Sequence, residues 1–295
     1  MKDFLPICQD DMKKRGWDSV DFAIITGDAY VDHPSFGTAI VSRLLESQGF
    51  KVGIIPQPDW KNPESVKILG RPNIAFLINA GNVDSMVANF SSKTKRRSRD
   101  QYSPGGVAGK RPDRAIIVYT SLAKSAYKGI PVVIGGIEAS LRRLSHYDYW
   151  SDSLKPSILL DSEADVLVYG MGERPILALA ELFQKPNWRE HLSSCPQIAY
   201  LENNIDKYQE EKPILLHSYQ DELSDKRKYG EDFVLFETES NKREQRTLIQ
   251  PYGKQYLVVR PPFPVATEEE MDSFALFDRM MNAPHPKYLK RGDIP

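Results

Sequence analysis

The sequence predicts an α/β protein with a doubly wound, mainly parallel five-stranded sheet, followed by a smaller α+β extension. Five apolar runs recur within about the first 185 residues, and each leads through glycine or polar residues towards a helical pattern. Such runs are typical of strands that are buried on both faces of a parallel sheet. The alternation indicates a Rossmann- or flavodoxin-like fold, whose ligands bind beyond the carboxyl ends of the strands. We expect a Rossmann-like domain over residues 1–187 and an extension over residues 188–295.

Each element of the first domain follows from a local pattern. A short helix with Trp17 as an anchor is expected before the first strand. Apolar side chains at helical spacing predict a helix over residues 37–49, and a second helical pattern covers residues 114–129. A third helix is expected from Glu173, with Pro175 in its first turn, where the missing amide of proline is tolerated. The expected strands are residues 22–26, 52–55, 73–79, 132–134 and 166–169, with a helical turn at 66–69.

The extension is expected to mix short strands with charged helices. Thr267 and Glu270 have the spacing of a capping box, which predicts a helix start. Two charged helical stretches are expected around Gly230. The final stretch, residues 282–295, is expected to close no element and to connect to a segment outside this chain. The expected strands are residues 197–201 and 213–217, and a hairpin over 247–260 with its turn at 251–254.

The composition of the 295-residue chain is that of an ordinary globular protein. Hydrophobic residues make up 41% and charged residues 27%, and the formal net charge is -1. This balance argues against binding of nucleic acid through bulk charge, although it leaves a local basic patch open. No apolar run approaches the roughly 20 residues of a membrane span. The N-terminus shows no secretory signal, so we expect a cytoplasmic protein without membrane contact.

The two cysteines predict neither a disulfide framework nor a metal site. Cys8 and Cys195 lie far apart in the sequence, and neither belongs to a closely spaced pair. The chain therefore offers no cluster of thiolates, and we expect it to hold no metal.

A first candidate site lies in the loop after the first expected strand. Asp28, Tyr30, Asp32 and His33 are close together there. Two carboxylates and an imidazole can bind a metal or act as acid and base. The alternative is that Asp32 and His33 cap the next helix and satisfy the loop.

A second candidate is the stretch PVVIGGIEASLRRLSHYDYW, residues 131–150. A β-branched strand ends there at a glycine pair, which lets backbone approach a ligand and leaves amide groups free for an anion. Polar, cationic and aromatic side chains follow within a short span. The alternative is a tight strand-to-helix turn with an ordinary helix start. The candidate residues are Gly135, Gly136, Glu138, Ser140, Arg142, Arg143, His146, Tyr147 and Asp148.

The turn after the fifth expected strand is a third candidate. Gly170, Gly172 and Glu173 bring flexible backbone and a carboxylate to the start of a helix. The alternative is that the carboxylate only stabilises the positive end of the helix dipole, by roughly 0.3–1 kcal/mol. Its place at the carboxyl end of a strand puts this turn beside the other candidate loops.

A long polar insertion after the third expected strand is the fourth candidate. Insertions of this length in compact α/β units are usually functional or mobile. Residues 93–99 contain five cations, and Lys110 and Arg111 follow. These side chains can bind phosphates of RNA or of a nucleotide, and the alternative is a solvated charge run. Phosphate binding here also calls for an aromatic platform, for which the sequence places only Phe90 and Tyr102 beside the run.

Several long motifs resemble a known family. AGKRPDRA, VIGGIEASLRRLSHYDYW and YGMGERP, in this order and spacing, are similar to the N-terminal region of YgiQ-family radical SAM proteins. NAGNVDSMVANF and the terminal APHPKY fit the same pattern. The resemblance covers essentially the whole chain and is densest from about residue 20 to residue 180.

The resemblance implies a cobalamin-binding-like α/β domain followed by a radical SAM barrel. In such proteins three cysteines spaced CxxxCxxC hold a [4Fe-4S] cluster, whose open iron binds and cleaves S-adenosylmethionine. Neither Cys8 nor Cys195 matches this motif. The resemblance therefore implies that the chain, as a fragment or a natural truncation, stops before the motif and that its partner is the absent barrel.

The cobalamin motif is matched only in part. Domains that bind cobalamin through a histidine resemble Asp-x-His-x-x-Gly. Asp32 and His33 are adjacent here, and Gly37 lies four residues after the histidine, so the spacing departs on both sides. The resemblance thus supplies no histidine ligand to cobalt. Related radical SAM proteins often keep the domain without that histidine, and corrinoid binding stays open.

We interpret the chain as the N-terminal part of a radical SAM protein with an unknown substrate. The crevice at its strand ends is expected to shape the face that meets the absent barrel. Two alternatives stay open: a stand-alone module that binds a corrinoid or a nucleotide, and an RNA-interaction module that uses residues 93–99. The near-neutral net charge argues against the second.

Overall fold

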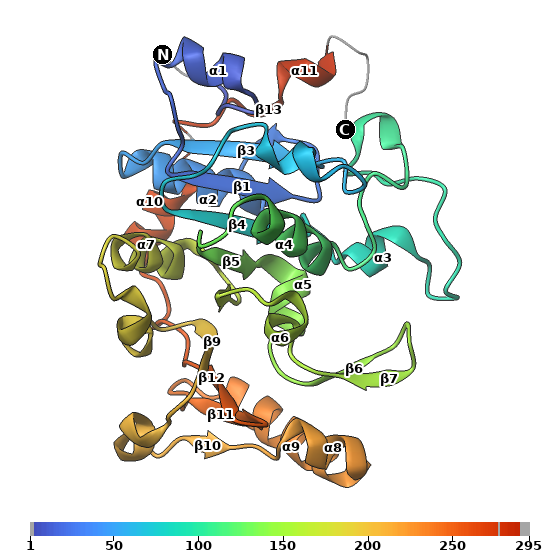
Figure 1. Ribbon diagram of the computed structural model, residues 1–295, viewed down its shortest axis with the longest axis vertical. Coiled ribbons are helices and arrows are strands. Elements are labelled where there is room, and N and C mark those ends of the chain that lie inside the picture. The colour runs from blue at the N-terminus through green and yellow to red at the C-terminus, as the bar shows by residue number, and fades with distance from the viewer. Residues whose placement is uncertain (1–2, 277, 290–295) are drawn as a thin grey trace.

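A nine-stranded sheet runs through the computed structural model, which describes residues 3–276 and 278–289 (Figure 1). Its strand order is β10-β11-β12-β9-β8-β5-β4-β1-β3. The strands of the N-terminal part are β1 (Phe22–Thr26), β3 (Val52–Pro56), β4 (Ala75–Asn79), β5 (Val132–Gly135) and β8 (Val166–Val168). All neighbours among these five pair in parallel, which confirms the predicted parallel sheet. Numbered along the chain, they follow the flavodoxin-like order 2-1-3-4-5.

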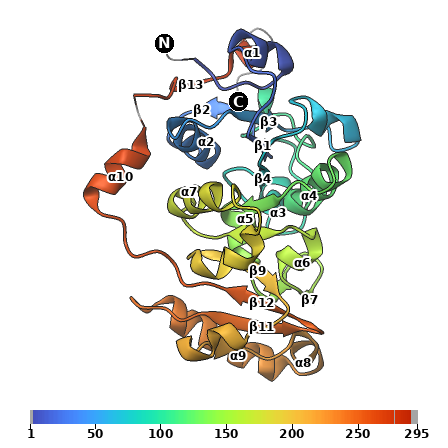
Figure 2. The ribbon, with the colours of Figure 1, turned by 60° about the vertical axis from the view of Figure 1, so that its left-hand side comes forward.

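Helices cover both faces of this sheet, as a doubly wound fold requires. The flanking helices are α2 (Gly37–Ser47) and α7 (Glu173–Leu182) on one face, and α4 (Ala115–Ala126) and α6 (Ile158–Ser162) on the other (Figure 2). Alternate residues of β1 contribute to the two cores, because successive side chains of a strand lie on opposite faces. Ile24 packs in the core with α2 and α7, and Ile25 in the core with α4 and α6. Every residue of β1 is buried, which explains its continuous apolar run.

The extension continues the same sheet. Its strands are β9 (Ile198–Glu202), β10 (Ile214–Leu215), β11 (Leu248–Tyr252) and β12 (Gln255–Val259). β9 pairs antiparallel with β8, so the sheet runs without a break across the expected boundary at residue 187. The division into two domains therefore stays a prediction. The predicted hairpin is present, and its turn is tight because Tyr252 already pairs with Gln255.

The boundary between the two charged helices of the extension lies at a different residue from the one expected. Gly230 lies inside α9 (Lys226–Ser240), so the expectation of a break there is wrong. The break falls at Asp225, after α8 (Tyr219–Ser224), because the Asp225 side chain accepts a hydrogen bond from the backbone N–H of Arg227 at 2.9 Å and starts α9. The capping box of α10 (Glu268–Ala275) is present as predicted.

The C-terminal segment returns to the first loop of the domain. β13 (Ala283–Pro284) pairs antiparallel with β2 (Val31–Asp32), and α11 (Pro286–Leu289) follows. The backbone N–H of Tyr30 donates to the hydroxyl of Tyr288 at 3.1 Å. The expectation that this stretch closes no element is therefore wrong for its described residues, because its pairing partner is about 250 residues away in the sequence. Residues 290–295 lie outside the described residues.

Several short elements complete the fold. The predicted first helix is present as α1, and the expected turn near residue 66 lies in the 3-10 helix η1. A small hairpin of β6 and β7 follows α5 and was not expected. The remaining elements are α1 (Gln9–Lys14), η1 (Pro63–Lys67), α3 (Ser85–Asn89), η2 (Pro104–Gly106), α5 (Gly136–Leu141), β6 (His146–Asp148), β7 (Ser153–Lys155), η3 (Trp188–Ser194) and η4 (Asp206–Glu211).

Two buried carboxyl groups join α8 to α9. Glu222 and Asp232 are only 2% and 4% exposed. Asp232 accepts hydrogen bonds from the backbone N–H and the Nδ1 of His217 at 2.7 and 2.9 Å. Burial and the neighbouring Asp232 raise the pKa of Glu222 to about 7. The folded protein therefore keeps a proton on Glu222 at pH values where an ordinary glutamate has lost it.

We expect the free energy of unfolding to fall as the pH rises from about 4.5 to about 7, because the folded state binds more protons than the unfolded state in this range. Glu222→Gln removes the titrating group and should remove this slope, which amounts to on the order of 2–3 kcal/mol over the range. Urea unfolding at a series of pH values measures it. The matched control is Glu244→Gln, at an exposed carboxylate before β11, which should keep the wild-type slope. Equal slopes for wild type and Glu222→Gln would contradict the assignment.

Candidate functional site

The carboxyl ends of β1, β4, β5 and β8 surround a pocket. The strand order reverses between β1 and β4, since α2 and α4 cover opposite faces of the sheet (Figure 2). Ligands of open α/β sheets bind in the crevice at such a switch point. The pocket has a volume of about 230 Å³. Its apolar lining includes Ile24, Val41, Leu77, Val133, Val168 and Ile176.

A polar rim borders the apolar lining. The Oδ1 of Asn79 accepts hydrogen bonds from the Thr26 hydroxyl at 2.8 Å and from the Gly81 backbone N–H at 2.9 Å, which fixes the turn after β4. The amide of Asn82 donates to the carbonyl of Ser35 at 2.9 Å and ties this turn to the loop before α2. The polar side chains on the rim are Thr38, Asn79, Asn82 and Glu173.

Glycines bring backbone to the mouth of the pocket. Gly136 has a φ of +80°, and a Cβ there would lie 3.4 Å from the Cβ of Asn79. Gly81 has a φ of +104°, and a Cβ there would lie 2.0 Å from the Oδ1 of Asp28. Both conformations favour glycine, so these turns depend on it. The predicted residues that the structure brings together around the pocket are Gly135, Gly136, Gly170, Gly172 and Glu173.

Two helices begin at the pocket without a side-chain cap. Neither Phe36 before α2 nor Gly172 before α7 accepts a capping hydrogen bond through its side chain. The first-turn amides of both helices therefore keep a positive end at the rim. Glu173 lies in the first turn of α7, and its Oε2 is buried without a hydrogen-bond partner among the described residues. Such an oxygen is stabilised by a hydrogen-bond donor, so the rim suits an apolar ligand that carries one.

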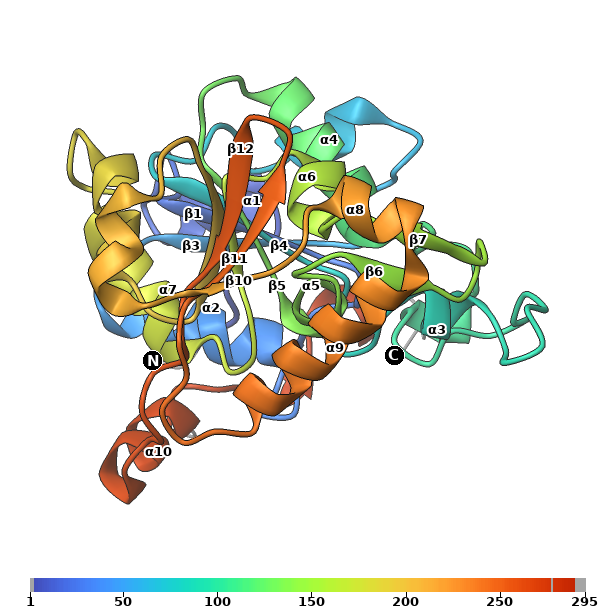
Figure 3. The ribbon, with the colours of Figure 1, turned by 90° about the horizontal axis from the view of Figure 1, so that it is seen from below.

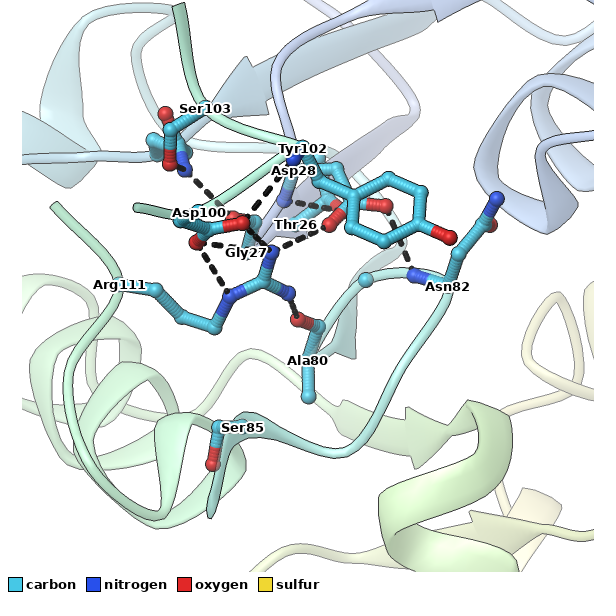
Figure 4. A network of polar contacts seen from close by, with 12 residues as sticks. Thr26, Gly27, Asp28, Ala80, Asn82, Ser85, Asp100, Tyr102, Ser103 and Arg111 are labelled. Carbon is cyan, nitrogen blue, oxygen red and sulfur yellow. Dashed lines mark hydrogen bonds and ion pairs between the residues drawn. The ribbon is translucent and has the colours of Figure 1, made fainter. Parts of the chain in front are cut away.

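Next to the pocket, Arg111 forms a buried ion-pair network (Figure 4). The Arg111 side chain is fully enclosed, and its Nη2 lies 2.8 Å from the Oδ1 of Asp28 and 3.2 Å from the Oδ2 of Asp100. Its Nη1 donates to the carbonyl of Ala80. The other carboxylate oxygen of Asp28 accepts from the backbone N–H of Asn82 at 2.7 Å. Burial raises the pKa of Asp28 to about 6, although Arg111 opposes the rise.

The two cations proposed for anion binding have other contacts. Two carboxylates pair with the guanidinium of Arg111, which favours a structural role for this residue over phosphate binding. The sequence hid this because one of the carboxylates, Asp28, comes from a distant loop. The amine of Lys110 is half-buried and lies 3.5 Å from the carbonyl of Pro104.

The first candidate group lies outside the pocket lining, all four members included: Asp28, Tyr30, Asp32 and His33. Asp32 is fully buried in an ion pair with Arg43. The Nδ1 of His33 accepts from the backbone N–H of Ser35 at 3.0 Å. Asp32 is thus paired with Arg43 of α2 and His33 with its own loop, which favours structural roles for both over a metal or acid–base site.

Glu138 holds two helix starts together. It is 1% exposed, and its carboxylate accepts from the backbone N–H of Ser85 at 2.8 Å and of Ile116 at 3.1 Å. Burial and the nearby Asp84 raise its pKa. Arg142 forms an ion pair with Asp84. Both candidates thus have structural partners that the sequence did not indicate, because α3 and α4 supply them.

Ser140 and Arg143 connect the second and third candidate stretches. The hydroxyl of Ser140 accepts from the backbone N–H of Gly170 at 3.0 Å, which joins the two glycine turns. The guanidinium of Arg143 lies 4.7 Å from the ring centre of Tyr169 and 4.6 Å from that of Phe236. Burial lowers the pKa of Arg143. Arg143 therefore packs between rings and does not reach the pocket.

The last three candidate residues of the second stretch, His146, Tyr147 and Asp148, form β6 and lie outside the pocket. Burial lowers the pKa of His146 to about 4, so its ring is neutral at pH 7. Asp148 accepts two hydrogen bonds from Arg114, at 2.8 and 3.1 Å. Burial alone would raise the pKa of Asp148, but Arg114 holds it well below its usual range. The exposed Tyr147 donates from its hydroxyl to Asp152 at 2.7 Å.

Sequence reasoning missed several residues of the pocket. A usable signal was present for two of them, because Asn79 and Asn82 flank the glycine turn at the end of β4. Residues on α2 gave no such signal, since an apolar helix face looks the same whether it covers a core or a ligand. The missed polar and flexible residues are Thr38, Asn79, Asn82 and Met171.

The residues of this chain do not fit an iron–sulfur cluster. Such clusters take their thiolate ligands from several cysteines. Cys195 is 4% exposed, and burial raises the pKa of its thiol to about 12. The thiol of Cys8 donates to Asp11 at 3.2 Å. Within residues 3–276 and 278–289, no group of three or more histidine, cysteine, aspartate or glutamate side chains could hold a metal ion.

The described helices include none with the length and apolar run needed to cross a bilayer.

The strand order and the pocket together define a doubly wound α/β fold with a crevice at its switch point. The family model described as Radical SAM N-terminal matches residues 4–295, and the chain therefore belongs to this family, as the motifs predicted. The UPF0313 protein of Clostridium botulinum (strain ATCC 19397 / Type A) is 47% identical over 294 residues. The UPF0313 protein of Clostridium perfringens (strain SM101 / Type A) is 47% identical over 292 residues. Each alignment covers 99% of this chain but only 45% and 44% of the relative, so the chain spans less than half of their length.

We expect Arg111→Met to lower the free energy of unfolding by about 3–5 kcal/mol, because it leaves two buried carboxylates without their cation. Lys110→Met is the matched control: it removes a neighbouring, half-buried cation and should cost under about 0.5 kcal/mol. Chemical denaturation measures both. Hydrogen exchange should also show faster opening of the amides of the insertion in Arg111→Met only. Equal losses for the two variants would contradict the role of the network.

Proposed function

We propose that this chain is the N-terminal part of a radical SAM protein that acts on a substrate not yet identified. In this proposal the intact protein binds a [4Fe-4S] cluster through residues outside this chain and cleaves S-adenosylmethionine for radical chemistry. The observation that carries the proposal is the family match over residues 4–295. The length of the relatives supports it, since more than half of each lies outside the aligned region and can supply the cluster ligands.

The crevice has the features expected of a surface that meets a second domain or a substrate. Its lining is mostly apolar, its rim carries one buried carboxylate oxygen of Glu173 without a hydrogen-bond partner among the described residues, and it opens at the carboxyl edge of the sheet. Because the chain's own cysteines do not fit a cluster, its part in the reaction would be binding and positioning. The crevice is the candidate surface for that part.

Reconstitution with iron and sulfide tests whether the cluster is bound by residues outside this chain. The chain of 295 residues should gain no cluster absorbance, whereas the intact protein that contains it should gain a cluster and form 5′-deoxyadenosine from S-adenosylmethionine under reducing conditions. A stable cluster on the chain alone would overturn the proposal. So would an intact protein that holds no cluster.

A second candidate function is binding of a corrinoid or a nucleotide in the crevice, and the pocket at the switch point favours it. Doubly wound sheets of this strand order bind the nucleotide FMN at this place. The apolar lining fits an uncharged ring, and the glycine turns let backbone reach its polar atoms. The fit does not extend to cobalt, because His33 is not among the lining residues and its Nδ1 accepts from Ser35.

Filling the pocket tests this second candidate. Val41→Trp places a large ring in the pocket from α2, and it should weaken binding of cobalamin or S-adenosylmethionine at least about tenfold, since the ring and the ligand need the same volume. Val234→Trp is the matched control on α9, where the side chain is 62% exposed, and should bind as wild type does. Calorimetric titration of each ligand into the chain measures this. No heat from either ligand with the wild-type chain removes the candidate and leaves the radical SAM proposal untouched.

A further inference from the structure

The insertion between β4 and α4 carries a strong local positive charge. Residues 85–112 contain seven lysines and arginines and one carboxylate, although the whole chain has a net charge of -1. Arg111 and the carboxylate, Asp100, neutralise each other in the buried network. The excess cations therefore gather on the loop of residues 91–99. Four of them are exposed and have no carboxylate partner in the described part of the chain: Lys93, Lys95, Arg97 and Arg99.

Aromatic rings from a distant part of the sequence lie against this loop. The ring of Trp150 lies 5.5 Å from that of Phe90 and 5.4 Å from that of Tyr149, measured between ring centres. The guanidinium of Arg96 lies 4.6 Å from the ring centre of Phe90. The hydroxyl of Tyr149 donates to the carbonyl of Ser92 at 2.7 Å, which ties the turn after β6 to the loop. The aromatic platform that the sequence did not show thus comes from residues about 55 positions further on.

The rings do not serve a core. Tyr149 is 55% exposed, and Trp150 is half-buried at the turn between β6 and β7. The loop after α3 and the β6–β7 hairpin project from the same side of the molecule, as Figures 1 and 3 show. The ion pair of Arg114 with Asp148 holds the end of β6, and the ion pair of Arg96 with Asp113 holds the loop of residues 91–99. The two arms together form a surface that combines exposed cations with the exposed ring of Tyr149 and the half-buried rings of Phe90 and Trp150.

We propose that this basic–aromatic surface, made by Phe90, Lys93, Lys95, Arg96, Arg97, Arg99, Tyr149 and Trp150, binds single-stranded nucleic acid. Lysines and arginines along a loop neutralise successive phosphates, and exposed rings stack on unpaired bases. A base pair inside a duplex offers no free face for stacking, so the rings favour single strands. An acidic protein or an anionic membrane would use the cations alone and would leave Tyr149 without a role.

Fluorescence anisotropy of labelled 12-nucleotide probes tests the proposal with the 295-residue chain. The probes are oligo(U), oligo(A), oligo(dT) and an RNA duplex of equal length. Single strands should bind more tightly than the duplex, and the RNA and DNA arms identify which sugar is preferred. Affinity should fall with salt with a slope of about -0.7 per neutralised phosphate on a log–log plot. No binding at low salt, or equal binding of the duplex, overturns the proposal.

Charge variants separate this surface from the rest of the chain. Lys93→Gln, Lys95→Gln and Arg99→Gln combined should make the salt slope shallower by about 2, because three phosphate contacts are lost. The matched control removes the same charge from other exposed positions: Lys226→Gln, Arg227→Gln and Lys254→Gln. The control should keep the wild-type slope. Equal changes in both triple variants would show attraction by bulk charge and would overturn the proposal.

Ring variants test the stacking. Tyr149→Ala should weaken binding of single strands about tenfold, whereas Tyr149→Phe, which keeps the ring, should stay within about twofold of wild type. Circular dichroism and thermal unfolding of each variant check that the fold is kept. If the two variants bind alike, or if polyglutamate or anionic vesicles compete as well as single-stranded RNA does, the surface is a general anion site and the proposal is wrong.

Discussion

One buried cation, Arg111, ties together the loops at the carboxyl ends of β1 and β4. Arg111 is taken out of water entirely, which is costly unless its charge is matched and its N–H groups are satisfied. The two carboxylates of Asp28 and Asp100 and the carbonyl of Ala80 meet both needs. These partners come from the end of β1, from the insertion and from the end of β4. The ion pairs therefore join three segments that the chain separates widely, and they do so beside the switch point where the pocket lies.

The same network explains why a long polar insertion is ordered. Its backbone makes few regular pairings, namely one turn of α3, one of η2 and two isolated bridges. The insertion is held instead by buried polar contacts at its two ends. At one end Glu138 accepts a hydrogen bond from the backbone N–H of Ser85, and at the other end Arg111 forms its ion pairs. An insertion held in this way can present exposed cations that contribute nothing to stability. The segment thus contains both buried charges with a structural role and exposed charges. The sequence alone does not show which of its cations are buried.

The sequence predicted what depends on local pattern and failed where distant segments meet. The apolar runs at β1 and β5 and the capping box at Thr267 are local signals, and the structure has elements there. Residues 283–284 pair with β2, some 250 residues away in the sequence, and no local periodicity predicts this pairing. The site follows the same rule. The glycine turns could be recognised because φ preferences are local, whereas the buried partners of Arg111 and Glu138 could not, because distant segments supply them. Whether a polar residue can bind a ligand or has a structural role depends on the tertiary contacts that bury it.

The basic–aromatic surface and the crevice share a single segment, and this constrains how they can work together. Asn82, on the rim, lies at the start of the insertion, and the loop of residues 91–99 lies in its middle. Because Arg111 anchors the far end to Ala80 and Asp28, the surface has a position relative to the crevice that buried contacts set. A nucleotide strand bound on the surface would therefore meet the carboxyl edge of the sheet in one orientation. In the functions proposed above, the cations and rings would align a strand and the crevice would enclose a ligand, while the buried contacts of Arg111 would hold the two sites in a fixed relation.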